Sequence, residues 1–230
     1  PLLAFDVDAA IAFRSRPRGI AGTATYARRD QLGALSPPPE PRVPAEALSY
    51  VVSLHESAIN NLAEQWGGKQ LDEATFWMIL NEEFKFRSED VENLPPGRVS
   101  SVVQLADDLP VTLRLRDSGI DVTLRVRGAG PEGAVQPSEV VTLRVRYDLS
   151  PSATGISLNR RGEIAVEPAT NQFDVALLER FFPALLTPRA RFNNAGQGQR
   201  MVVRDLRLDN GWLVLGVGPA PAARVTPEAK

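Results

Sequence analysis

The sequence lacks cysteine altogether and contains a single histidine, His55. Without cysteine the chain has neither a disulfide framework nor a thiol nucleophile, and it cannot bind zinc or an iron–sulfur cluster through thiolates. A single imidazole also excludes any metal site that needs two histidines from one chain. We therefore expect no metal and no cofactor.

Lysine is scarce as well, because 23 of the 26 basic residues are arginine. The formal net charge of −2 argues against a globally basic protein that binds nucleic acid. No stretch approaches the roughly 18 uninterrupted apolar residues of a membrane-spanning helix. The chain has 230 residues, of which 43% are hydrophobic and 23% charged, and this composition is typical of a globular protein.

The pattern along the chain predicts one α+β domain over residues 1–218, followed by a flexible tail at 219–230. Apolar residues alternate from Leu3 to Phe13, and a turn at 16–19 leads to a weaker strand, so residues 1–30 form an opening hairpin. Five prolines make residues 34–46 an extended connector. The main body then covers residues 47–218.

Three helices are expected in that body. The first covers about 54–66, after a short strand, with a capping box that begins at Ser53 and a stop at Gly67-Gly68. The second covers about 72–86, with Asp72 as its N-cap. The third covers 173–186, where Pro183 should break the helix near Phe182. This third helix either packs in the core across a sheet or lines an apolar cavity.

The remaining body reads as β structure. Residues 111–116, 122–127 and 141–146 are near-copies of one strand pattern, and a turn at Ser118-Gly119 would place Arg116 opposite Asp121. Residues 128–138 form a loop, 156–166 a hairpin around 159–162, and 202–217 a hairpin around Asp209-Asn210-Gly211. The expected fold is a curved antiparallel sheet of about 8–10 strands, packed on or wrapped around about three helices.

The three similar strands carry arginines on one face, which would form a grid if the strands are neighbours. This face can bind an anionic group of a lipid, polysaccharide or other polyanion through bidentate contacts. The alternative is a solvated face whose arginines pair with acids such as Asp121. The residues concerned are Arg114, Arg116, Arg125, Arg127, Arg144 and Arg146.

Catalytic signals are sparse. His55 and Ser57 stand at a strand-to-helix junction and offer a base and a hydroxyl, but the sequence has no second histidine and no Gly-x-Ser-x-Gly elbow. The alternative is that these residues cap the helix. We therefore name no catalytic residue, and we keep a hydrolase that uses His55 with Ser57 as an alternative.

The order of the elements is similar to that of a known family. The segment 51–62, then long alternating strands, then Phe-Phe-Pro-Ala-Leu-Leu at 181–186 and a closing hairpin resemble tubular lipid-binding (TULIP-like, BPI-like) β-rolls and related bacterial envelope lipoproteins. The resemblance covers about residues 45–218. It implies a curved sheet around a long helix, with a lipid chain in the groove and no fixed catalytic residues.

The sequence therefore predicts a non-enzymatic protein that binds a lipid or another apolar or amphipathic molecule. The arginine face would attract a membrane surface or polyanion, and the protein would be periplasmic, envelope-associated or secreted. The alternative is a structural or interaction module of a larger bacterial surface protein, with a filled core and contacts to the rest of its parent chain. The candidate groove residues are Ile59, Leu62, Trp66, Phe76, Leu80, Phe181, Phe182 and Leu185.

Overall fold

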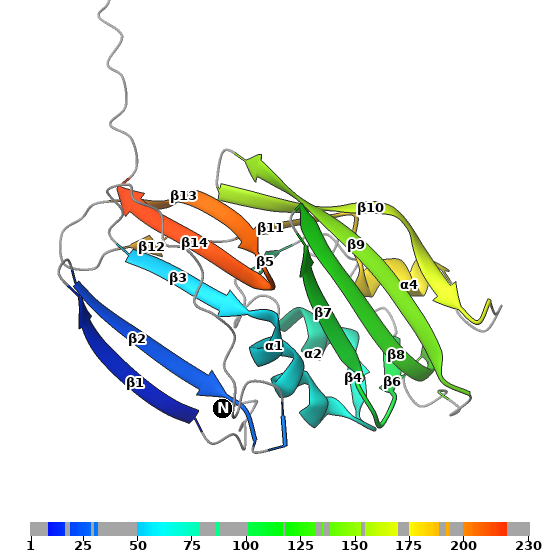
Figure 1. Cartoon of the computed structure of the whole chain (residues 1–230). Helices are drawn as coiled ribbons and strands as arrows, with labels where there is room; N and C mark the ends of the chain where they lie inside the picture. Colours follow the sequence, from blue (N-terminus) through cyan, green and yellow to red (C-terminus); the bar gives the residue numbers. More distant parts are fainter. Residues whose placement is uncertain are drawn as a thin grey trace, which may run out of the picture.

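The computed structural model describes residues 9–16, 19–28, 30–31, 50–78, 86–87, 101–116, 118–131, 135, 139–152, 155–169, 175–188, 192–193 and 200–219. These residues form a mixed α+β structure dominated by antiparallel sheets, with three short α-helices (Figure 1). The helices are α1 (Glu56–Ala63), which continues into the 3-10 turn η1 (Glu64–Trp66), α2 (Glu73–Met78) and α4 (Val175–Phe181).

The strands belong to three sheets. A hairpin of β1 (Ala9–Arg16) and β2 (Gly19–Tyr26) confirms the opening hairpin over its described residues. The small sheet has the order β12 (Phe192–Asn193), β13 (Arg200–Asp209), β14 (Trp212–Pro219) and β3 (Tyr50–His55). The large sheet has the order β4 (Gln70–Asp72), β6 (Ser101–Leu105), β8 (Gly119–Pro131), β9 (Val141–Ser152), β10 (Gly155–Glu167), β11 (Leu185–Pro188) and β5 (Phe86–Arg87), and β7 (Val111–Arg116) also pairs with β8.

The three similar strand patterns are neighbours, as predicted, in β7, β8 and β9. Their predicted register is wrong by two residues, because Arg116 lies opposite Gly119 and Arg114 lies opposite Asp121. A shift by two residues keeps every side chain on its expected face, since side chains alternate with a period of two. Alternation therefore determined the faces but not the length of the turn.

Two predicted β features are corrected. Residues 156–166 do not form a hairpin, because β10 is one long strand that pairs with β9 and has an irregularity between Arg161 and Ala165. Turn residues between two alternating runs are equally compatible with a bulged strand, and Gly162 at the bulge has a φ of +73°. Residues 128–131, expected to be loop, continue β8 and pair with β6.

The helix ends also differ in part from the prediction. His55, not Ser53, caps α1, because its side chain accepts a hydrogen bond from Ser57 N. Asp72, which directly precedes α2, is confirmed as its N-cap, because its Oδ1 accepts a hydrogen bond of 2.8 Å from Thr75 N. Phe86 belongs to β5, so the second helix ends before that residue. Ser53 fails as a cap because it belongs to a strand that pairs with β14.

Pro183 ends α4 as predicted, since the helix stops at Phe181. Leu185 and Leu186 are therefore in β11 and not in the helix. The carbonyl groups after the helix have specific donors: the Arg160 guanidinium donates to Phe182 O at 2.6 Å, and the buried Tyr147 hydroxyl donates to Pro183 O at 3.1 Å. These bonds attach the end of α4 to the large sheet.

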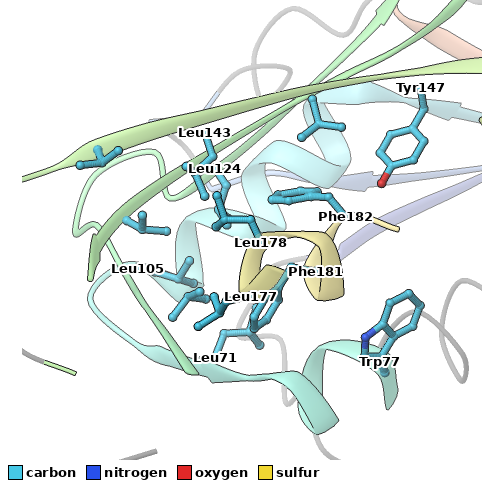
Figure 2. Packing of buried hydrophobic residues seen from close by; sticks show 14 of the residues in the cluster. Leu71, Trp77, Leu105, Leu124, Leu143, Tyr147, Leu177, Leu178, Phe181 and Phe182 are labelled. Carbon is cyan, nitrogen blue, oxygen red and sulfur yellow. The ribbon is translucent and has the colours of Figure 1, made fainter. Parts of the chain in front are cut away.

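One apolar cluster forms the main core. Figure 2 shows Leu178 and Phe181 of α4, and Phe182 directly after it, between the large sheet and the segment that carries Leu71. Phe181 is 2% exposed, and its ring centroid lies 5.3 Å from that of Phe76. The Trp77 indole donates to Arg180 O at 3.0 Å, which ties α2 to α4. The core is thus built from the large sheet and the two helices α2 and α4.

The hairpin at 202–217 is confirmed by β13 and β14, with Asp209 opposite Trp212. Asn210 and Gly211 have φ values of +48° and +81°, as a two-residue type I′ turn requires. The predictions for the connector at 34–46, for Leu80 and for the tail beyond Pro219 lie outside the described residues. The same holds for residues 1–8.

Candidate functional site

The predicted groove residues divide between the core and two other places. Phe181 and Phe182 are buried in the core cluster, and Trp66 and Phe76 pack against it. Ile59 and Leu62 are half-buried on α1, outside that cluster. Leu185 is 41% exposed on β11, and Leu80 lies outside the described residues. The structure therefore brings four of the eight side chains together, and it brings them together as core.

The arginine face exists and is paired with acids. The six arginines share one face of β7, β8 and β9, and each forms an ion pair of 2.7–3.3 Å with a carboxylate. Asp121 accepts from Arg116 and from Arg146. A polyanion would have to compete with these carboxylates for every guanidinium. The carboxylates belong to Glu56, Asp107, Asp108, Asp121, Asp148 and Glu167.

His55 and Ser57 are within hydrogen-bonding distance, with 2.8 Å between Nδ1 and Oγ. The same Nδ1 accepts from Ser57 N at 3.1 Å, so this nitrogen caps α1. The ring also bonds to the backbone of Asn210 and stands edge-on to Trp212, with 5.0 Å between ring centroids. Ser57 is 7% exposed. The pair thus joins the start of α1 to the turn between β13 and β14.

The pKa of His55 gives the first testable prediction. Burial lowers this pKa below 6.5, although the Glu56 carboxylate and the bond to Asn210 favour the protonated ring. Between the lowered pKa and 6.5 the unfolded chain binds more protons than the native chain, so the free energy of unfolding should fall as the pH falls below 6.5. Urea denaturation at a series of pH values below 6.5 should show this decrease in the free energy of unfolding.

The control for that prediction is His55→Asn, because asparagine is a good N-cap that does not titrate. This variant should retain the helix and flatten the pH dependence near neutrality. Since His55 is the only histidine, its NMR titration also gives the native pKa without assignment ambiguity. A native pKa above 6.5 would contradict the prediction.

Helix α1 covers the outer edge of β7 with side chains. Asn60 Oδ1 accepts from Leu113 N at 2.7 Å, and Asn60 Nδ2 donates to Leu113 O at 3.0 Å. One turn earlier, Glu56 Oε2 accepts from Leu115 N at 2.6 Å. Residues four apart share one helix face, so α1 satisfies the edge of β7 much as another strand would.

The small sheet has a partly exposed apolar face that sequence reasoning missed. Two cross-strand rows of three side chains lie on the same face of β13, β14 and β3, because directly opposed residues point the same way. We call this surface the leucine face. Its first row is Leu206, Leu215 and Val52, and its second row is Leu208, Leu213 and Leu54.

None of these six side chains belongs to the described core cluster. Val52 is 45% exposed, and the five leucines are half-buried. Both faces of β14 are covered in part: Val214 on the opposite face and Val217, which follows Leu215 on the same face, are each 0% exposed. The alternation at 202–217 could have revealed the leucine face, but only once β3 was known to pair with β14.

No protein-family model matches the chain, and no curated protein is significantly similar to it. Over the described ranges, no three His, Cys, Asp or Glu side chains come together as a metal site would require. No helix in the same ranges is long and apolar enough to cross a membrane. The resemblance to tubular lipid-binding proteins and the location outside the cytoplasm stay predictions.

Proposed function

We propose that the chain is a non-enzymatic interaction module that binds a partner polypeptide through the leucine face. The observation that carries the proposal is the set of six apolar side chains on three adjacent strands, partly exposed and separate from the main core. Exposed apolar patches of this kind are typical of interaction surfaces.

Two further observations favour binding over catalysis and over a lipid groove. The ring nitrogens of His55 bond to backbone groups at a helix start and a turn, and the Ser57 hydroxyl is buried. The aromatic side chains that a groove would need, Phe181 and Phe182, are buried in the core cluster. An interaction module needs no groove, and the burial of these two side chains agrees with that.

The test is a selection from a random peptide library displayed on phage. The wild-type protein should enrich peptides with apolar residues at regular spacing, and the double variant Leu206→Ser/Leu215→Ser should bind the selected peptides at least about tenfold more weakly. Leu185→Ser is the matched control, because it removes an exposed leucine from another sheet. Equal binding by the wild-type protein and the double variant would refute the proposal.

A second measurement addresses lipid. Native mass spectrometry of the purified protein, followed by organic extraction, should show the mass of the bare chain or its oligomers. A lipid-sized adduct that is released on denaturation would restore the lipid-binding prediction and contradict the filled core.

A further inference from the structure

The edges of the sheets are protected unequally. In the large and small sheets, β4, β5 and β12 are edge strands of only two or three residues, and α1 covers β7. Strand β3 is different: it has six residues, Tyr50–His55, and pairs with β14 on one side only in the described part of the chain. It contains no Lys, Arg, Asp, Glu or Pro, which are the residues that natural edge strands use against pairing.

The backbone of β3 presents regular hydrogen-bonding groups at this edge. Glu56 N donates to Gly211 O at 2.9 Å, and these two residues continue the register in which His55 opposes Trp212. In an antiparallel pair the bonded positions alternate, so Leu54 and Val52 bond toward β14. The amide groups of Val51 and Ser53 therefore point toward the other edge.

We infer that this edge binds the same edge of a second copy of the chain, in an antiparallel pair around a two-fold axis at Ser53. This inference goes beyond the proposed function, because the second copy binds at the edge of β3 and leaves the leucine face to the partner polypeptide. With Ser53 opposite Ser53 of the other copy, Val51 lies opposite His55 of the other copy. Residues whose backbone groups point outward are then opposed only to residues of the same kind, so each outward N–H faces an outward C=O.

The same register matches the side chains. It places Val52 opposite Leu54 of the other copy, in the positions between bonded pairs, where side chains come closest. Val52 is the most exposed member of the leucine face, at 45%, and it becomes covered by a leucine. The two small sheets then form one continuous sheet, and the two leucine faces form one continuous apolar surface. A two-fold contact needs this kind of self-complementary edge.

The test compares Ser53→Pro with Ser53→Ala. Proline removes the outward amide of Ser53 without touching the bonds to β14, and edge strands tolerate proline at such positions. Sedimentation equilibrium of the wild-type chain should show a monomer–dimer equilibrium, which Ser53→Ala retains. Ser53→Pro should weaken it at least about tenfold, because the two-fold axis doubles each lost bond. Val52→Lys should weaken it in the same way.

Hydrogen exchange gives a second readout that does not depend on a variant. The amides of Val51 and Ser53 should exchange more slowly as the protein concentration rises, while the amide of Leu54 should not change. A wild-type chain that stays monomeric, or a dimer that persists in both Ser53→Pro and Val52→Lys, would overturn the inference. A monomer that still selects peptides through Leu206 and Leu215 would overturn self-pairing alone and leave the proposed function standing.

Discussion

Replacing Phe181 by alanine is expected to lower the free energy of unfolding by about 3–5 kcal/mol. The side chain is 2% exposed and lies among residues of α4, α2 and the large sheet, so its removal leaves a cavity that these elements cannot close. Urea denaturation followed by circular dichroism measures the loss. The result also decides between the two interpretations of the third helix, because a side chain that lines an open groove would cost far less to remove.

The matched control is Leu185→Ala. Leu185 is 41% exposed, and its truncation is expected to cost less than about 1 kcal/mol. If Phe181→Ala costs no more than this control, and gains affinity for small apolar molecules, α4 lines a groove and the filled core is wrong.

Replacing Asn60 by alanine should lower the free energy of unfolding by about 2–3 kcal/mol. The amide side chain bonds both the N–H and the C=O of Leu113, so alanine leaves two backbone groups at the edge of β7 without their partner. A backbone donor or acceptor left without a partner lowers the free energy of unfolding by more than one hydrogen bond contributes on balance. The single side chain of Asn60 therefore has a large effect on stability.

Residue-specific hydrogen exchange identifies the cause of that loss. In Asn60→Ala the Leu113 amide should exchange faster than in the wild-type protein. The increase should be larger than the loss of global stability alone would cause. The Leu124 amide, which belongs to β8, should follow global stability alone. Glu56→Gln is the control variant, because an amide oxygen can still accept from Leu115 N. Unchanged exchange at Leu113 would show that α1 does not protect the edge.

Local patterns predicted those features that depend on neighbouring residues. The Asp209-Asn210-Gly211 turn, the Asp72 cap and the break at Pro183 were all foreseen, because each follows from backbone conformations that few residues adopt. Alternation also placed the six arginines on one face. It could not determine the register of β7 and β8, because a shift by two residues leaves all faces unchanged.

The candidate site was less predictable, since it depends on which distant segments meet. The sequence pattern of β10 fits either a hairpin or a bulged strand. The structure shows the bulged strand, because both halves of β10 pair with the long neighbouring strand β9. The apolar positions of Leu206 and Leu215 could be read from their hairpin, but Val52 lies more than 150 residues earlier in the chain. Nothing local indicates that β3 completes that face.

The sequence by itself determined the class of structure, the faces of the strands and the ends of several elements, because these depend on side-chain period and on turn and cap chemistry. Only the tertiary structure decided that Phe181 and Phe182 are core, that the arginines are paired with acids, and that α1 protects β7 while β3, among the described residues, pairs on one side only. An apolar side chain has the same pattern whether a core or solvent lies beside it. The packing of segments far apart in the chain decides which of the two it meets.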